Sequence, residues 1–352
     1  MSTSSSSSSA AGGAQTSPIA MSYASSSSIP VGFGMSGESL YAASESLPVE
    51  RVTRLGEGQH SPTHGLPASE VLTIDFKNDE IEFHEELGRG ASGATVYACS
   101  IKGMFFAAKI MDSSTFPSEE QTQRMLSEIS ITAQLRHENV VRLLAFDYRE
   151  DKKEIRMFTQ IYPETLWQVI ASRAATGKPF TPKEVVDFAF QIARGLHYLG
   201  RQDPPIIHRD LKSDNIFVSW DNHRKPRRLH IGDFDTSKIL DTTGAKTFTQ
   251  VGTPGWMAPE VFTESGRGHG VKADVWSFGM VLYELIVMKQ PYFDKNHFEI
   301  STCNVKGIRP TVPESVDKEA FKELLKLFNK CTNKKPQDRP STADILATLA
   351  AM

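Results

Sequence analysis

The sequence predicts an α+β fold with two lobes: a small β-rich lobe with one main helix, followed by a larger helical lobe. Two patterns lead to this prediction. Between residues 71 and 162, short apolar runs alternate with polar residues or glycines, as strands do. From Pro163 onward the apolar residues recur mostly with a helical period. No internal repeat appears, so we expect one folded domain over residues 71–352, with lobes of about 71–162 and 163–352.

The first 70 residues differ in composition from the rest of the chain. Serine runs fill positions 4–9 and 25–28, and no helical or strand period is sustained. Such a segment buries too little apolar surface to offset the entropy that ordering would cost. We therefore expect residues 1–70 to be a disordered Ser-rich tail, which serves either as a solubilising extension or as a platform for regulatory phosphorylation.

The small lobe is expected to contain one helix and several short strands. A helix is predicted over 121–135, because Met125, Ile129, Thr132 and Leu135 fall along one stripe. Strands are predicted at 81–84, 95–98, 105–111, 140–146 and 156–161.

The larger lobe is expected to be mostly helical. Pro182 is suited to the first turn of a helix, and the helical pattern runs from there to Leu199. A loop-rich middle follows over about 203–270. Further helices are predicted at roughly 273–288, 317–331 and 341–350.

The charge balance disfavours a dedicated nucleic-acid binder. The chain has 39 Lys and Arg residues against 42 Asp and Glu residues, a net charge of −3, whereas nucleic-acid binders usually carry a basic excess. The most apolar stretch, 275–288, is shorter than the roughly 20 residues that a membrane span needs, and it contains Glu284. We expect no nucleic-acid partner and no membrane partner.

The cysteines and the N-terminus favour a reducing compartment. Cys99, Cys303 and Cys331 are odd in number, widely separated and without C-x-x-C spacing, which disfavours a disulfide framework or a zinc site. The N-terminus has no charged segment followed by an apolar run, as a secretory signal would. We expect a cytoplasmic protein.

A glycine motif lies between two predicted strands. Gly88, Gly90 and Gly93 follow Leu87 in the pattern G-x-G-x-x-G. Glycines allow a tight turn whose backbone can approach phosphates, because no Cβ intervenes. A flexible hairpin loop would have the same composition, so the motif alone leaves both readings open. A dinucleotide-binding fold would place it between a strand and a helix, and here the strand pattern continues.

Lys109 stands in an apolar strand pattern, where a charge is costly to bury without a partner. Glu128 lies on the one helix of the small lobe and could be that partner. The alternative is that both side chains reach the surface as unrelated charges.

The segment around Asp210 carries the strongest chemical signal. Lys212 follows two residues after Asp210, Asn215 follows five residues after it, and Asp233 comes 23 residues later. A carboxylate can accept a proton from an attacking hydroxyl, and a lysine can neutralise a phosphoryl group. An amide and a second carboxylate are hard oxygen ligands that suit Mg²⁺. A chance match to this ordered set is improbable.

Some charged residues further along the chain suit a structural role. Glu260 and Arg339 could form a buried ion pair, and Asp274 could accept hydrogen bonds from backbone N–H groups.

Taken in order, these motifs resemble the eukaryotic protein kinase family over about residues 75–352. Segments 135–141 and 256–260 are similar to the tyrosine-kinase-like group of serine/threonine kinases. The resemblance rests on the glycine loop, Lys109, Glu128, His208-Arg209-Asp210, Asp233-Phe234, Ala258-Pro259-Glu260 and Arg339.

The resemblance implies a bilobal protein-kinase fold, a protein substrate, and ATP and Mg²⁺ as cofactors. Asp210 would accept the proton of the substrate hydroxyl, and Lys212 would stabilise the transferred phosphoryl group. Asn215 and Asp233 would bind Mg²⁺. Lys109, paired with Glu128, would hold the α- and β-phosphates.

The remaining nucleotide contacts also follow from the resemblance. Leu87, Gly88, Gly90 and Gly93 would cover ATP. Thr159 would stand at the gatekeeper position. The adenine would lie between Val96, Ala107 and Phe217, beside a hinge strand from Gln160 to Tyr162.

Lys212 and Thr253 resemble serine/threonine kinases, with tyrosine or dual specificity as the alternative. Arg209 beside Asp210 implies control by phosphorylation of the activation segment, and we expect Thr247 or Thr249 to carry the phosphate. An upstream kinase or a regulatory partner would then act on this chain.

Three positions depart from the family pattern. Asp235 replaces the usual glycine after Asp233-Phe234, the glycine loop is one residue longer before Val96, and Thr132 replaces a larger apolar residue. These departures leave a second reading open, in which the chain is a pseudokinase-like nucleotide-binding scaffold.

Overall fold

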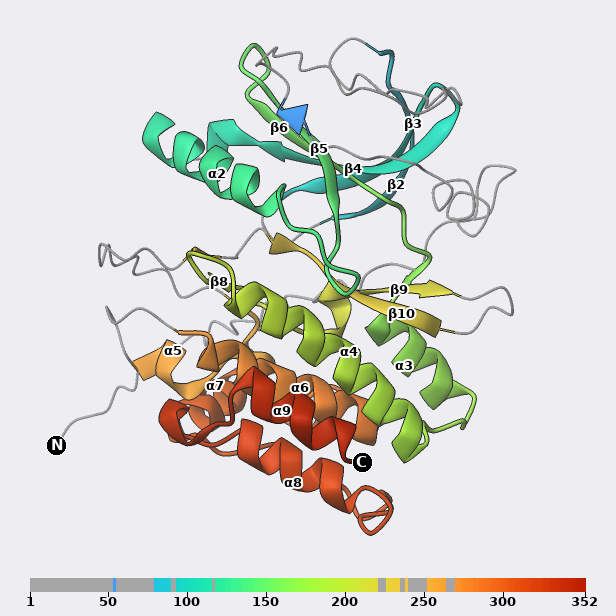
Figure 1. The fold of residues 1–352 in the computed structure, drawn as a ribbon, viewed down its shortest axis with the longest axis vertical. Helices are drawn as coiled ribbons and strands as arrows, with labels where there is room; N and C mark the ends of the chain where they lie inside the picture. Colours follow the sequence, from blue (N-terminus) through green and yellow to red (C-terminus); the bar gives the residue numbers. More distant parts are fainter. Residues whose placement is uncertain are drawn as a thin grey trace, which may run out of the picture.

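The computed structural model describes residues 79–89, 93–115, 118–220, 226–234, 238–239, 252–263 and 270–352, together with Thr53 and Arg54. Figure 1 shows a sheet and one helix at the top and a larger group of helices below. The predicted α+β architecture with two lobes is confirmed. The tail expected over residues 1–70 lies outside the described residues, apart from Thr53 and Arg54.

The sheet of the small lobe has the strand order β1-β5-β6-β4-β3-β2. Strands β2 to β6 pair antiparallel with their neighbours, and the short β1 pairs parallel with β5. In this register Lys109 lies opposite both Val96 and Met157, and Ala107 lies opposite Thr159. The strands are β1 (Thr53–Arg54), β2 (Glu82–Arg89), β3 (Thr95–Ile101), β4 (Met104–Asp112), β5 (Leu143–Arg149) and β6 (Glu154–Thr159).

Helix α2 (Glu119–Thr132) is the one main helix predicted for the small lobe. The Ser118 side chain caps it by accepting a hydrogen bond from the Gln121 backbone N–H. Leu126 and Ile129 pack in an apolar cluster with residues of β4, β5 and β6. The helix ends at Thr132, three residues earlier than predicted, because the chain turns there toward β5.

Helix α6 (Lys272–Val287) forms the centre of the larger lobe. Every residue from Ala273 to Val287 is buried, as expected for a helix without a polar face that is covered on all sides. Gly279 allows α8 to approach closely, since a Cβ there would lie 2.6 Å from Thr332 Cγ2. The other helices are α3 (Leu166–Ala175), α4 (Pro182–Gly200), α5 (Pro259–Thr263), α7 (His297–Lys306), α8 (Lys322–Cys331) and α9 (Thr342–Ala350).

The predicted middle region contains more regular structure than its sequence indicated. Its strands β9 and β10 form a three-stranded sheet with the earlier strand β7, and β8 pairs with β11. The Val140–Ile231 bridge joins this region to the small lobe. These strands are β7 (Glu164–Thr165), β8 (Ile206–Ile207), β9 (Ile216–Trp220), β10 (Pro226–Ile231) and β11 (Lys238–Ile239).

The two structural predictions for charged residues are confirmed. Arg339 forms a two-pronged ion pair with Glu260, with nitrogen–oxygen distances of 2.6 and 2.7 Å, and the Arg339 side chain is fully buried. The Asp274 carboxylate accepts hydrogen bonds from the backbone N–H groups of His208 and Arg209, at 2.8 and 3.0 Å.

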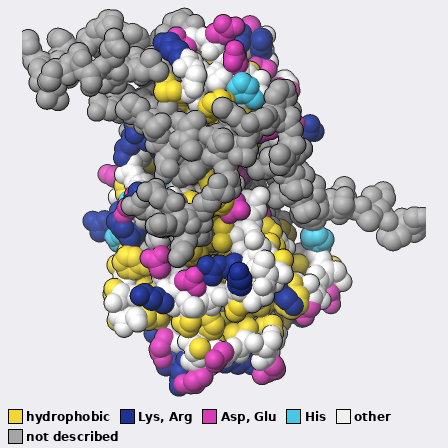
Figure 2. Space-filling model, turned by 90° about the vertical axis from the view of Figure 1, so that its right-hand side faces the viewer, with side chains coloured by type: hydrophobic (Ala, Val, Ile, Leu, Met, Phe, Trp, Pro, Cys, Tyr) yellow, Lys and Arg dark blue, Asp and Glu magenta, His cyan; other side chains and the backbone are white. Residues whose placement is uncertain are grey.

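Surface charge follows the balance seen in the composition. On the face shown in Figure 2, basic and acidic side chains are scattered among uncharged ones in both lobes. Within the described part of the chain, every helix is too short or too polar to cross a bilayer.

Candidate functional site

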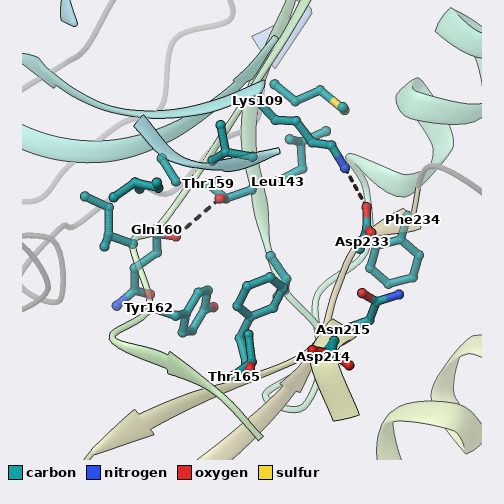
Figure 3. A pocket seen from close by; sticks show the side chains of 18 of the residues that line it. Lys109, Leu143, Thr159, Gln160, Tyr162, Thr165, Asp214, Asn215, Asp233 and Phe234 are labelled. Carbon is teal, nitrogen blue, oxygen red and sulfur yellow. Dashed lines mark hydrogen bonds and ion pairs between the residues drawn. The ribbon is translucent and has the colours of Figure 1, made fainter. Parts of the chain in front are cut away.

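A cavity of about 340 Å³ lies between the sheet of the small lobe and strand β9 of the larger one. Figure 3 shows side chains from both lobes pointing into it. The structure therefore brings together residues that are far apart in the sequence. The predicted site residues that line it are Leu87, Gly88, Val96, Ala107, Lys109, Glu128, Thr159, Gln160, Tyr162, Asn215, Phe217 and Asp233.

Some predicted site residues stand elsewhere. Asp210 and Lys212 lie beside the cavity rather than in its lining, in the loop that leads into Asn215. Gly93, the last glycine of the motif, does not line the cavity and has a φ of 81°, a backbone conformation that residues with a side chain rarely adopt. Gly90 lies outside the described residues.

Lys109 and Asp233 meet across the cavity. Lys109 Nζ donates to Asp233 Oδ1 at 2.5 Å, although the two residues are 124 positions apart. The exposed fraction of the side-chain surface is 17% for Lys109 and 32% for Asp233, so solvent screens this ion pair little. Burial alone would raise the pKa of the Asp233 carboxyl. The Lys109 ammonium, with smaller contributions from His208 and Lys212, outweighs burial and holds that pKa below its usual value.

Glu128 lines the same cavity from α2, as the predicted partnership with Lys109 requires. The carboxylate that the ammonium of Lys109 contacts at 2.5 Å belongs to Asp233. Burial lowers the pKa of the Arg209 guanidinium, and the charges of Glu128 and Asp274 partly oppose that shift. The Glu128 side chain therefore lines the cavity, and its negative charge also acts on Arg209 in the segment around Asp210.

The backbone before Asp233 is confined on all sides. A Cβ on Gly232 would lie 2.7 Å from Val141 and 2.8 Å from Phe217, so only glycine fits there. The Gly232 carbonyl lies 2.8 Å from His208 Nε2. Asp233 itself has a φ of 61°, which non-glycine residues adopt rarely and mostly at functional sites.

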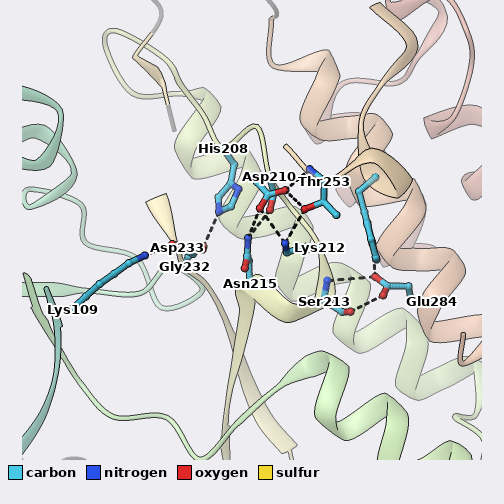
Figure 4. A network of polar contacts seen from close by, with 11 residues as sticks. Lys109, His208, Asp210, Lys212, Ser213, Asn215, Gly232, Asp233, Thr253 and Glu284 are labelled. Carbon is cyan, nitrogen blue, oxygen red and sulfur yellow. Dashed lines mark hydrogen bonds and ion pairs between the residues drawn. The ribbon is translucent and has the colours of Figure 1, made fainter. Parts of the chain in front are cut away.

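Asp210 is held in one orientation by its neighbours, as Figure 4 shows. Its Oδ1 accepts hydrogen bonds from the Thr253 backbone N–H at 2.8 Å and from the Thr253 hydroxyl at 2.7 Å. Its Oδ2 accepts one from Asn215 Nδ2 at 3.1 Å and lies 3.3 Å from Lys212 Nζ. Lys212 Nζ also donates to the Thr253 hydroxyl at 2.8 Å.

The donor set fits a divalent cation bound with a phosphorylated ligand. Asp233 stays ionised at neutral pH because the charge of Lys109 outweighs the effect of burial on its pKa, and a carboxylate is a preferred ligand of Mg²⁺. Asn215 donates to Asp210 through Nδ2, which leaves its Oδ1 oxygen for a cation. Lys109 and Lys212 supply positive charge on either side of these oxygens.

Comparison with known proteins agrees with this geometry. The sequence matches the family described as protein kinase domain over residues 81–349, which is well over half of the chain. The chain belongs to the protein kinase family. The matched range begins just before β2 and ends within α9, so it spans both lobes of the kinase.

Curated relatives are similar over most of this chain. Kinase and exchange factor for Rac B from Dictyostelium discoideum is 34% identical over 283 residues, which cover 79% of this chain and 24% of that protein. Serine/threonine-protein kinase WNK8 from Arabidopsis thaliana is 32% identical over 285 residues, covering 78% of this chain and 47% of that protein. Serine/threonine-protein kinase CTR1 from the same plant is 27% identical over 277 residues, covering 78% and 32%. The chain thus spans less than half the length of these relatives.

The part of the kinase cavity beside Tyr162 and Phe217 is aromatic and apolar. The rings of Tyr162 and Phe217 lie 5.4 Å apart between centroids, and the Thr159 hydroxyl donates to the Gln160 carbonyl at 3.2 Å. Behind Thr159 the cavity continues toward α2. This rear part is lined by Met111, Met125, Ile129, Thr132, Met157 and Phe234.

The sequence patterns missed several residues of this site. Val141, Leu143 and Asp214 line the cavity, but each belongs to a segment whose periodicity shows only a strand or a loop. Glu284 was noted only as a charge in an apolar stretch, yet it contacts the loop that carries Lys212 and Asn215. Its position in an otherwise apolar helix was the one available signal. Asp235, Thr247 and Thr249 lie outside the described residues.

Proposed function

We propose that this chain is a serine/threonine protein kinase that transfers the γ-phosphoryl group of MgATP to hydroxyls of proteins. The arrangement around Asp210 carries the proposal. Its carboxylate is fixed by Thr253 and Asn215, and Lys212 stands next to it. This group lies beside a cavity in which Lys109 and the ionised Asp233 face each other.

The roles of the individual residues follow from their charge and position. Asp210 accepts the proton of the attacking hydroxyl, and Lys212 offsets negative charge on the phosphoryl group as it is transferred. Lys109 binds the α- and β-phosphates, with Glu128 as its counter-ion. Asn215 and Asp233 hold Mg²⁺, which neutralises phosphate charge when it is bound. Because so little of the reaction needs covalent help from the protein, these residues act mainly by positioning.

In this proposal the nucleotide is held by residues of the cavity lining together with the glycine loop. Leu87, Gly88, Gly90 and Gly93 cover the phosphates. Thr159 is the gatekeeper beside the hinge. The adenine ring lies between Val96, Ala107 and Phe217, beside the hinge residues Gln160 and Tyr162.

The contact between Lys212 and Thr253 supports serine/threonine specificity. The Thr253 hydroxyl joins Lys212 to Asp210, so the turn that carries Thr253 is fixed against the proton-accepting carboxylate. Membership of the tyrosine-kinase-like group is part of this proposal, and it agrees with the similarity to CTR1.

Regulation and setting complete the proposal. The charges of Glu128 and Asp274 already act on Arg209, which stands next to Asp210. A phosphate on Thr247 or Thr249 would add a further anion beside Arg209 and order the activation segment. An upstream kinase would supply that phosphate. We further propose that residues 71–352 form the kinase domain, that residues 1–70 form a tail, and that the protein acts in the cytoplasm.

A phosphate-incorporation assay tests the function. The full chain is incubated with Mg²⁺, radiolabelled ATP and a basic protein substrate, and Asp210→Asn serves as the matched control. We expect serine and threonine labelling by the unmodified chain and a loss of at least 100-fold in the variant. Equal incorporation by the two proteins would instead indicate the nucleotide-binding scaffold, and phosphotyrosine in the product would refute the specificity.

Regulation is tested by Thr247→Ala/Thr249→Ala in the same assay. We expect the double variant to lose activity that the unmodified, phosphorylated chain has. Unchanged activity would refute control at these two threonines.

A further inference from the structure

Glu284 is a buried acid in the last turn of helix α6. Its side chain has no exposed surface, and its carboxyl group contacts two residues outside the helix. Oε1 lies 2.6 Å from the Ser213 hydroxyl, and Oε2 accepts hydrogen bonds from Trp256 Nε1 at 2.8 Å and from the Ser213 backbone N–H at 3.3 Å. Figure 4 shows the carboxyl group on the side of Ser213 that faces away from Asp233.

The two partners of Glu284 belong to the two segments that meet at Asp210. Ser213 follows Lys212 directly and lies in the 3-10 turn that ends at Asn215. Trp256 ends the turn Pro254–Trp256, which begins after Thr253. Thr253 and Asn215 both donate hydrogen bonds to the Asp210 carboxylate. Glu284 therefore connects the same two segments, the loop that ends at Asn215 and the turn that follows Thr253, at a second point.

No cation among the described residues pairs with Glu284. None of the ion pairs includes it, and the charged group that acts on it is Asp214, which is also an acid. An unpaired carboxylate without water is strongly disfavoured in a protein interior. Burial therefore raises the pKa of Glu284 to about 8, and Asp214 adds to the shift, while the hydrogen bonds from Ser213 and Trp256 oppose it.

A neutral carboxylic acid satisfies this site. Its carbonyl oxygen accepts from the two N–H groups of Ser213 and Trp256, and its hydroxyl shares a proton with the Ser213 oxygen 2.6 Å away. A carboxylate in the same place would face Asp214 with no counter-charge.

We propose that Glu284 is a positioning residue for phosphoryl transfer. As a neutral acid, it fixes the loop that carries Lys212 and Asn215 against the turn from Thr253 to Trp256. The role rests on the proposed kinase function, because it acts through groups that surround Asp210. Glu284 does not line the nucleotide cavity, so its effect falls on kcat and on the protein substrate rather than on ATP binding.

Glutamine is the matched probe for this role. In Glu284→Gln the amide oxygen accepts from the same two N–H groups, and the amide N–H donates to the Ser213 oxygen. The variant therefore reproduces the neutral acid at every pH. Glu284→Ala removes all three hydrogen bonds. Tyr283→Phe is the control, because it removes a partly buried hydrogen bond from the adjacent residue to the Thr311 carbonyl.

The first experiment measures kcat and both KM values of the full chain from pH 6 to 9. At pH 7 we expect Glu284→Ala to lower kcat by about 10-fold or more while the KM for ATP stays within about twofold, and Glu284→Gln to restore most of the loss. Above pH 8 the unmodified enzyme should decline more steeply than Glu284→Gln. Tyr283→Phe should follow the unmodified profile. Glutamine that rescues no better than alanine, or superimposable profiles of the unmodified and glutamine proteins, would overturn the proposal.

The second experiment needs no catalysis. The pKa of Glu284 is higher in the folded chain, about 8, than its value of 4.5 in model peptides. Stability supplied by the neutral acid is therefore complete below pH 4.5 and is lost as the pH rises through 8. We expect the melting temperature of the unmodified chain to fall relative to Glu284→Gln between pH 5 and 8.5. A constant difference would refute a neutral Glu284, whereas failure of the kinase function itself would appear as equal incorporation by the unmodified chain and Asp210→Asn.

Discussion

Removal of the Thr253 hydroxyl tests whether Asp210 must be held in its observed orientation. The hydroxyl donates to Asp210 Oδ1 at 2.7 Å and accepts from Lys212 Nζ at 2.8 Å, so it joins two charged groups. Thr253→Val keeps the volume and the backbone N–H bond to Asp210 but removes both side-chain bonds. A hydrogen bond to a charged group contributes about 1.5–3 kcal/mol. If one such contribution is lost in the transition state, kcat falls by about 10- to 150-fold.

Steady-state phosphorylation of a basic protein measures this effect. Thr253 does not line the cavity, so the KM for ATP should change by less than about threefold. Thr253→Ser keeps the hydroxyl and is the matched control, which should retain most of the activity. The reasoning is refuted if Thr253→Val retains kcat within about twofold of the unmodified enzyme, or if Thr253→Ser loses as much as Thr253→Val.

Three further predictions concern stability, measured by thermal or urea unfolding. Arg339→Ala leaves Glu260 buried without its cation and should cost about 3–5 kcal/mol, whereas an unchanged midpoint would show that the pair is dispensable. Gly279→Ala places a methyl group 2.6 Å from Thr332 Cγ2 and should cost about 1–3 kcal/mol through overpacking of α6 against α8; no loss would mean that α8 shifts freely. Burial, assisted by Arg228 and opposed by Glu138, lowers the pKa of His230 to about 4. The neutral imidazole therefore stabilises the folded protein above pH 6.5, and this stabilisation is lost as the pH falls through 4. His230→Gln should therefore flatten the acid side of the stability profile between pH 6.5 and 4, and parallel profiles would contradict this.

The motifs made the site predictable, because each contains the residue type that its chemistry needs. Lys109, Asn215 and Asp233 were expected to meet, and all three line one cavity. The sequence also indicated the pairing of Glu260 with Arg339, because both charges stand in segments that showed no catalytic pattern. Such predictions succeed where the local motif allows few residue types and where few residues elsewhere in the chain could be the partner.

Helix α7 was not predicted, although its ends carry clear signals. Asn296 and Glu299 form a capping box, and Gly307 ends the helix with a left-handed φ of 67°. Its interior mixes polar and apolar residues, so no amphipathic stripe marks it. Strands β9 and β10 were missed for a related reason, because their pairing depends on distant contacts such as the bridge of Val140 with Ile231.

The bond from Lys109 to Asp233 also depends on such distant contacts. The sequence offered Glu128 as the partner of Lys109, since an acid on the only helix nearby is the simplest source of a counter-charge. Which carboxylate lies 2.5 Å from the ammonium depends on the relative placement of the lobes. That placement is governed by contacts that carry no local pattern, among them the bond from the Ile231 backbone N–H to the Asn139 carbonyl at 2.9 Å.

Helix α6 explains how the proposed catalytic groups, which lie on loops, can be positioned accurately. Asp274 in its first turn accepts the backbone N–H groups on the N-terminal side of Asp210, and Glu284 near its last turn holds Ser213 on the C-terminal side. Both acids are buried, so their hydrogen bonds are shielded from competing water. Loops have few contacts of their own, whereas α6 is packed on every side, and its rigidity passes to the loop through two hydrogen-bonded carboxyl groups. The accuracy at Asp210 therefore depends on a helix that does not touch the cavity.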